Sequence, residues 1–123
     1  MTWLRPILGD LEYGFATLAP GAPLPAAIEP IATFAESEGR TIIAPAAQLA
    51  DAGLPHKPGW ALITIALATD LDATGITAAI ATALAEAGIA ANVVAAYHHD
   101  HLFVPWERRR EALAILERLE APR

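Results

Sequence analysis

The sequence lacks cysteine altogether, and Ser37 is its only serine. The first absence excludes disulfides, thiolate metal sites and cysteine nucleophiles, and the second leaves no basis for a serine triad. Long apolar runs are also missing: residues 60–68 are far too few to span a bilayer. Residues 1–6 show no basic region followed by an apolar stretch, so no secretory signal is expected. We therefore expect a cytoplasmic protein.

Basic residues are scarce. Eight Lys and Arg face 14 Asp and Glu, which gives a formal net charge of -6 over 123 residues. Proteins that bind nucleic acids normally carry a basic face, and anionic membranes attract basic segments. The one basic cluster, Arg108 to Arg110, lies among glutamates. Neither a nucleic acid nor a membrane is an expected partner.

Ten prolines and eight glycines punctuate the chain, and they are dense in its first half. Residues 20–25 and 53–59 are predicted loops. Tyr13–Leu18 and Arg40–Pro45 are predicted strands, the second because it is β-branched and stops at proline. Residues 25–34 are ambiguous, because Pro30 would interrupt a helix there.

The second half has a clearer order of strand, helix, strand, strand and helix. These predicted elements are a buried strand at Trp60–Leu67, a helix at Ile76–Ala87 stopped by Gly88, an apolar segment at Ile89–Tyr97, a turn at His98–Asp100, a strand at Leu102–Val104 and a helix from near Trp106 to Leu119. This order is the ferredoxin-like arrangement short of its last strand, which an N-terminal strand can supply.

These elements predict an α+β fold with a mostly antiparallel sheet and two helices on one face. We expect a single domain over residues 1–123. Residues 1–59 would add strands and loops to a core formed by residues 60–123. The three tryptophans, Trp3, Trp60 and Trp106, are expected to anchor the core or an interface.

The segment from Asp70 to Thr77 joins a predicted strand end to a predicted helix start. Free backbone N–H groups and the positive end of the helix dipole favour a carboxylate or phosphate at such a position. Gly75 would let a ligand approach the backbone. Plain N-capping by Asp72 or Thr74 explains the same residue types, and both interpretations can hold together.

The segment Tyr97-His98-His99-Asp100-His101 holds three histidines and a carboxylate, the donor types of a metal site. On an extended strand, however, His99 and His101 would share one face and His98 and Asp100 the other. Two ligands do not make a tight zinc site. The alternative is that these residues are the polar turn of a hairpin.

Two further charged clusters have open interpretations. Glu36 and Glu38 are either an acid/base pair that grips a ligand amine or a solvated turn before the strand at Arg40. Arg108 to Arg110 form either an anion site or a solvated helix face with Glu107 and Glu111 nearby. The solvated interpretation is favoured for both clusters.

Several segments carry a family resemblance: residues 71–79 and 92–105, joined by residues 15–18, 36–41 and 60–63. Together they resemble a small bacterial ACT-domain family, similar to the ACT modules of aspartokinases and of the eukaryotic cytosolic arginine sensor. The run His99-Asp100-His101-Leu102-Phe103-Val104-Pro105 is its most specific part. His98 departs from the pattern, where a tyrosine is expected.

The resemblance implies a ferredoxin-like module that binds a small ligand, usually an amino acid, at a subunit or domain interface. Carried onto this sequence, the implied ligand-binding residues are Asp72, Thr74, Gly75, Ile76, Thr77 and Asn92. Because the residues offer no catalytic constellation, we also expect a regulatory protein without catalytic activity. No cofactor is expected.

Three functional hypotheses follow. The first is a homodimer that binds an amino acid near Asp72–Thr77 and regulates an enzyme. The second is a metal-binding protein or metalloenzyme that uses His99, Asp100 and His101. The third is a structural subunit that regulates a partner through an exposed sheet edge or helix face.

Overall fold

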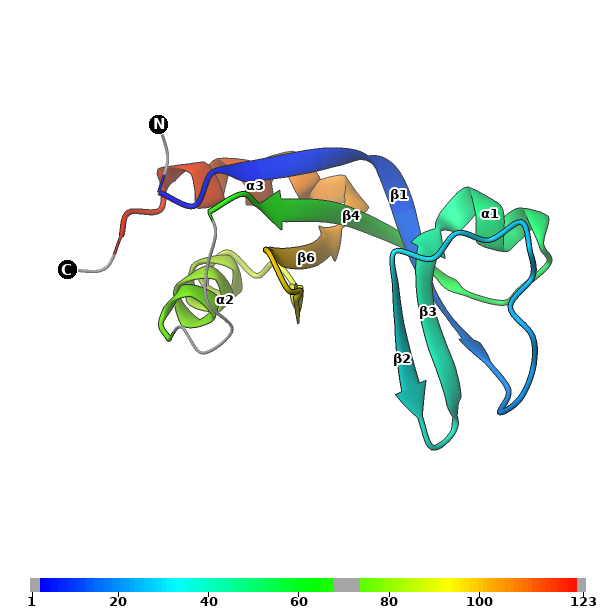
Figure 1. Cartoon of the computed structure of the whole chain (residues 1–123). Helices are drawn as coiled ribbons and strands as arrows, with labels where there is room; N and C mark the ends of the chain where they lie inside the picture. Colours follow the sequence, from blue (N-terminus) through cyan, green and yellow to red (C-terminus); the bar gives the residue numbers. More distant parts are fainter. Residues whose placement is uncertain (1–2, 68–73, 122–123) are drawn as a thin grey trace. The chain divides into compact units, whose positions relative to one another are not determined.

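The computed structural model describes residues 3–67 and 74–121. Strands and helices follow one another along this part of the chain (Figure 1). In chain order they are β1 Pro6–Leu18, β2 Ala32–Glu36, β3 Gly39–Pro45, α1 Ala46–Asp51, β4 Lys57–Ile65, α2 Ile76–Glu86, β5 Asn92–Ala95, β6 Asp100–Pro105, the 3-10 turn η1 Trp106–Arg108 and α3 Arg109–Arg118.

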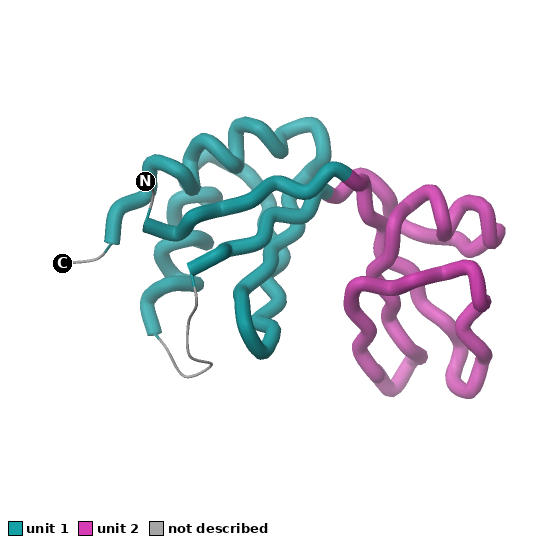
Figure 2. Tube along the Cα trace, turned by 45° about the horizontal axis from the view of Figure 1, so that its top comes forward, with its two compact units in different colours: residues 1–10, 61–123 teal, residues 11–60 magenta. Residues whose placement is uncertain are grey.

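The strands pair in the order β2-β3-β1-β4-β6-β5. The pairs β1–β3, β2–β3 and β5–β6 are antiparallel. The chain divides into two compact units, residues 1–10 with 61–123 and residues 11–60 (Figure 2). Because β1 and β4 each cross this division, each unit contains four strands. The predicted α+β, ferredoxin-like, mostly antiparallel fold is confirmed.

In the unit of residues 1–10 and 61–123, the strand order is β1-β4-β6-β5. Its elements β4, α2, β5, β6 and α3 follow the ferredoxin-like order in sequence. The fourth strand comes from the N-terminal residues of β1. The expectation that an N-terminal strand completes the sheet is therefore confirmed.

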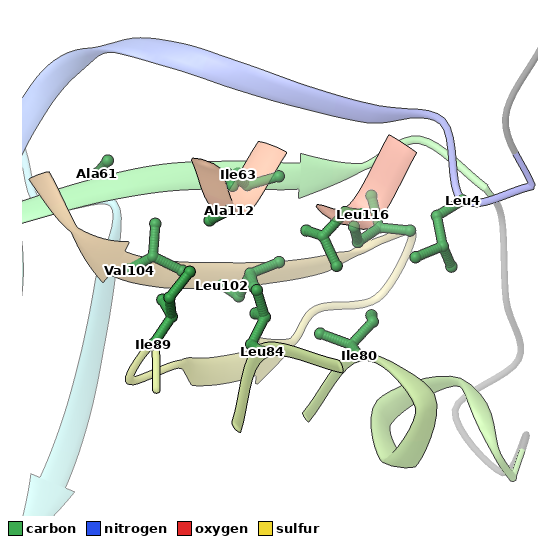
Figure 3. Close-up of a cluster of buried hydrophobic side chains, with 11 residues drawn as sticks. Leu4, Ala61, Ile63, Ile80, Leu84, Ile89, Leu102, Val104, Ala112 and Leu116 are labelled. Atoms are coloured by element: carbon green, nitrogen blue, oxygen red, sulfur yellow. The ribbon is translucent and has the colours of Figure 1, made fainter. Parts of the chain in front are cut away.

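One face of this sheet is buried under both helices. Alternate residues of β4 and β6 point to this face, where they meet side chains of α2 and α3 (Figure 3). The buried cluster consists of Leu4, Ala61, Ile63, Ile65, Ile80, Leu84, Ile89, Leu102, Val104, Ala112 and Leu116. The two helices therefore lie on one side of the sheet, as predicted.

The unit of residues 11–60 repeats the strand pattern with less helix. Its order is β2-β3-β1-β4, and α1 is its one helix among the described residues. The segment between β1 and β2 carries four prolines, which prevent a helix there. Its buried cluster consists of Ala16, Leu18, Ile28, Ile42, Ala44 and Leu49.

Four features differ from the sequence-based expectation. β1 begins at Pro6 rather than Tyr13, and β4 begins at Lys57, inside the predicted loop. Neither β2 nor α1 was expected. Local signals are weak in these segments. The first residues of β1 depend on pairing with the distant strand β4, β2 on its hairpin with β3, and α1 on the burial of Leu49. That residues 1–123 act as one ACT-like domain stays a prediction.

Candidate ligand-binding site

No side chain of the described residues caps the start of helix α2. Its N-cap residue is Gly75, with φ of 90°, and no side chain of that residue can cap the helix. A positive φ of this size suits glycine, because it has no Cβ. Capping by Thr74 is therefore not the arrangement found, and Asp72 lies outside the described residues. Among the described residues, no side chain caps the N–H groups of the first turn, so they can bind another acceptor.

The predicted site residues around this turn are mostly accessible. Thr74, Gly75 and Thr77 are exposed, whereas Ile76 is half-buried and packs against the core. The backbone of the turn and the hydroxyl of Thr77 are thus available to a ligand, while Ile76 anchors the helix start. The structure brings these four residues together because they are consecutive.

The turn between β5 and β6 lies at the same end of the sheet. The Oγ1 of Thr64 and the Nδ1 of His101 are 3.0 Å apart, so the last residues of β4 lie beside the first residues of β6. β4 then leads into α2, and β6 emerges from the turn. Tyr97 is 82% exposed in this turn, and its ring contacts that of His98 at 4.9 Å between centroids.

Asn92 is placed differently from the other predicted site residues. It pairs with Phe103, whereas its neighbour Val93 pairs with Leu102. Leu102 belongs to the core under the helices. Because successive strand residues point to opposite faces, the side chain of Asn92 points away from the face that α2 covers. The structure does not bring Asn92 to the start of α2.

The histidine segment forms a polar hairpin turn. The N–H of Ala96 donates to the carbonyl of His99 at 3.1 Å. Asp100 is 8% exposed and shares its strand face with Leu102, while His101 points to the other face and contacts Thr64. Within residues 3–67 and 74–121, no three histidines or carboxylates come together in a group that could hold a metal ion. This donor set does not fit a metal site.

Two histidine rings of this segment have unusual surroundings. The Nδ1 of His99 is buried, and no hydrogen-bond partner exists for it among the described residues. Burial lowers the pKa of His101, nearby His99 lowers it further, and Asp100 acts in the opposite direction. His101 is therefore favoured in its neutral form.

Glu36 and Glu38 lie on the hairpin between β2 and β3, as the solvated-turn interpretation predicts. The hydroxyl of Thr41 donates to Glu36, and the hydroxyl of Ser37 donates to Glu38 at 2.7 Å. The bond from Ser37 is the main cause of a lowered pKa at Glu38. Both carboxylates are exposed and have local partners, so the acid/base interpretation receives no geometric support.

Arg108 has a role that the sequence did not reveal. It pairs with Glu111 at 2.9 Å, as expected of a solvated face. Its other N–H groups donate to the carbonyls of Ala87 and Gly88, each at 3.0 Å. These carbonyls follow the end of α2, so Arg108 ties α2 to α3. Only the three-dimensional packing of the two helices could show this.

A cavity of about 460 Å³ lies in the unit of residues 11–60. Its lining includes the side chains of Phe15, Ala16, Thr17, Thr41, Pro55, His56 and Lys57. The Nδ1 of His56 lies 2.8 Å from the carbonyl of Leu54, so it is the nitrogen that carries the hydrogen of the neutral ring. The only sequence signal was a histidine-lysine pair between prolines, within a predicted loop.

No helix of the described residues is both long and apolar enough to cross a membrane. The ferredoxin-like strand order of the two four-stranded units defines the fold class. Two family models, each described as an ACT domain, match residues 1–58 and 56–118. The chain belongs to the ACT-domain family, whose members are commonly small-molecule regulatory domains.

Solved structures agree with this assignment. A Vibrio cholerae protein of unknown function, described as a possible transport protein, is 41% identical with a TM-score of 0.82, over 94% of this chain and 89% of its own. An Agrobacterium tumefaciens protein is 21% identical with a TM-score of 0.78, over 90% and 84% of the two chains.

The regulatory subunit of aspartate kinase from Thermus thermophilus shares the fold at 12% identity. Its TM-score is 0.67, and the match covers 95% of this chain and 97% of that subunit. Among curated proteins, none matches this chain.

Proposed function

We propose that this protein is a non-catalytic regulatory subunit that binds an amino acid at the start of α2. The observation that carries the proposal is the first turn of α2 after Gly75, for which the described residues provide no side-chain cap. The N–H groups of Ile76 and Thr77 would donate to the α-carboxylate, with support from the helix dipole. Asp72, nearby in sequence, would accept from the amine. Membership of the ACT-domain family supports a small-molecule ligand.

The neighbouring turn between β5 and β6 offers groups for the ligand side chain. Tyr97 and His98 are exposed there, and the buried Nδ1 of His99 has no partner among the described residues. A buried nitrogen without a hydrogen bond is costly, and a bound ligand or water would remove that cost. Asn92 would contribute only from a second copy, since its side chain points to the other face.

We propose further that the protein is a homodimer that transmits its signal to a partner enzyme. The sheet ends in two short edge strands, β2 with five residues and β5 with four. Pairing of such an edge with a second copy would satisfy its free backbone groups. Sedimentation of the purified chain at two concentrations tests this, and a monomer at both would contradict it.

The ligand proposal is tested by a thermal-shift screen of the twenty amino acids. A ligand at about 100 times its Kd adds roughly 2.7 kcal/mol to the free energy of unfolding, which raises the melting temperature by several degrees. We expect one amino acid, or a chemically related group, to give such a shift.

A matched pair of variants locates that ligand. Thr77→Pro removes one N–H donor in the first turn of α2, where proline is tolerated, and should abolish the shift. Thr77→Ala keeps the N–H and should preserve it. If no amino acid shifts the melting temperature, or if both variants respond as the unchanged protein does, the proposed site is wrong.

A further inference from the structure

A second cavity, of about 390 Å³, lies in the unit of residues 1–10 and 61–123. It is formed by β1 and by the start of α3, with lining residues Leu8, Gly9, Asp10, Trp106, Arg109, Arg110 and Leu113. Small-molecule sites in proteins have volumes of roughly 300–1,000 Å³. The cavity is thus large enough for a small metabolite, and it does not include the α2 turn.

Arg109 is held in place within this lining. Its guanidinium carbon lies 3.8 Å from the centre of the Trp106 ring, and its Nη1 donates to the carbonyl of Trp106 at 2.8 Å. Stacking on an aromatic ring fixes the guanidinium plane. Further N–H donors of the same group remain for a ligand. A side chain fixed before binding loses little entropy when the ligand arrives.

The charges of the lining are not neutralised by ion pairs. Among the described residues, the ion pair at this end of α3 joins Arg108 to Glu111, and none involves Arg109, Arg110 or Asp10. This is notable because Asp and Glu outnumber Lys and Arg by 14 to 8 in the chain. Arg108 has a structural role, whereas the next two arginines line a cavity with free donors.

We propose that this cavity binds a small organic carboxylate that carries an amino or hydroxyl group. Arg109 and Arg110 bind the carboxylate, since a guanidinium matches its two oxygens with parallel hydrogen bonds. Asp10 accepts a hydrogen bond from the amino or hydroxyl group. Leu8, Leu113 and the Trp106 ring contact the hydrocarbon part. This site is separate from the proposed amino-acid site at α2.

The test uses three ligands with one carbon skeleton: isovalerate, 2-hydroxyisovalerate and valine. Binding to the full chain is followed through the indole N–H resonance of Trp106, assigned by comparison with Trp106→Phe. We expect saturable shifts with 2-hydroxyisovalerate or valine, and binding of isovalerate that is weaker by about fivefold or more, because isovalerate offers Asp10 no donor.

Charge variants distinguish a specific binding site from nonspecific electrostatic attraction. Arg109→Gln should weaken binding by about tenfold or more, and Arg110→Gln, which leaves the stack on Trp106 intact, should also weaken it. Arg118→Gln removes the same charge from the far end of α3 and should change nothing. Asp10→Asn should remove the preference for 2-hydroxyisovalerate or valine over isovalerate.

Four outcomes would overturn the inference. They are no saturable shift with any of the three ligands, equal weakening by Arg118→Gln, a preference unchanged by Asp10→Asn, and loss of the Trp106 signal in Thr77→Pro. The last result would place the ligand at the α2 turn. It would leave the proposed function standing while removing this second site.

Discussion

Single residues carry the pH response expected of this fold, and His101 is the principal example. Burial lowers its pKa, with a further contribution from His99 and an opposing one from Asp100. In the unfolded chain the pKa returns to its ordinary value of about 6.5. The unfolded state therefore binds more protons than the folded state when the pH falls through this range.

We predict that the free energy of unfolding decreases as the pH is lowered below about 6.5. The decrease ends once the pH is below the lowered pKa of folded His101. Above that range the contribution of His101 is constant. Thermal unfolding between about pH 5 and pH 8 measures this pH dependence. The variant His101→Gln should reduce the slope of the free energy of unfolding against pH. Thr64→Val removes the hydroxyl partner but keeps the burial, so its slope should remain. Equal slopes in His101→Gln and the unchanged protein would contradict the prediction.

The residues of the candidate site could be predicted from sequence only in part. The helix start at Gly75 and Ile76 could be predicted because a strand end, a glycine and a helical pattern are local signals, whereas a ligand-binding role for these residues and Thr77 stays a prediction. The side-chain direction of Asn92 depends on the register of β5 against β6, which no local signal reveals. Stacking of Arg109 on Trp106 became visible only in the folded helix start.

Among the secondary-structure elements, α2 shows how strongly a local signal can act. The N–H of Ile89 donates to the carbonyl of Leu84, and that of Gly88 donates to Ala85, each at 2.9 Å. With φ of 71° at Gly88, these bonds form a Schellman motif. The predicted helix stop is therefore confirmed. Arg108 donates to the carbonyls of Ala87 and Gly88 at this helix end.

Gly88→Ala should destabilise the protein by about 1–2 kcal/mol, because alanine is strained at a positive φ. Steric overlap is not the cause, since an added Cβ would meet Arg108 only at 3.9 Å. Gly88→Asn should cost less, because asparagine tolerates this conformation better. Urea unfolding of the unchanged protein and of the two variants measures the order of their stabilities. An alanine variant as stable as the unchanged protein would refute this role of Gly88.

Predictability also differs between elements. The strand near Trp60–Leu67 and the helix near Ile76–Ala87 were found, because apolar runs and helical spacing are local properties. β2, α1 and the first residues of β1 were missed. β2 is held by its hairpin with β3, as in the pairing of Ala32 with Ile43. The first residues of β1 are held by the distant strand β4, and α1 by burial of Leu49 in the core cluster of its unit. Local propensity is too weak to indicate them.

The whole molecule is organised by two strands that serve both compact units. β1 crosses the division between Asp10 and Leu11, and β4 crosses it between Trp60 and Ala61. Neither unit has four strands without these two. On this basis we propose that the chain behaves as one domain in unfolding, although each unit has its own buried cluster.

We predict a single cooperative unfolding transition, in which the calorimetric and van't Hoff enthalpies agree. Tryptophan fluorescence provides a separate reading for each unit. A variant with Trp3→Phe and Trp106→Phe reports through Trp60 on residues 11–60, and Trp60→Phe reports on the other unit. Coincident midpoints support one domain. Two separated midpoints would show that the units unfold independently.

The N-terminal strand that completes the sheet of the C-terminal unit imposes an order on biosynthesis. Residues 6–10 leave the ribosome before their partner strand β4, which follows some fifty residues later. The unit of residues 11–60 has all its strands once Trp60 has emerged, whereas the other unit needs β6 and α3. Domains generally acquire structure from the N-terminus during synthesis. Here residues 6–10 are made before the unit of residues 11–60 but belong to the other unit, so Ile7 and Leu8 stay without their partner strand until β4 has emerged.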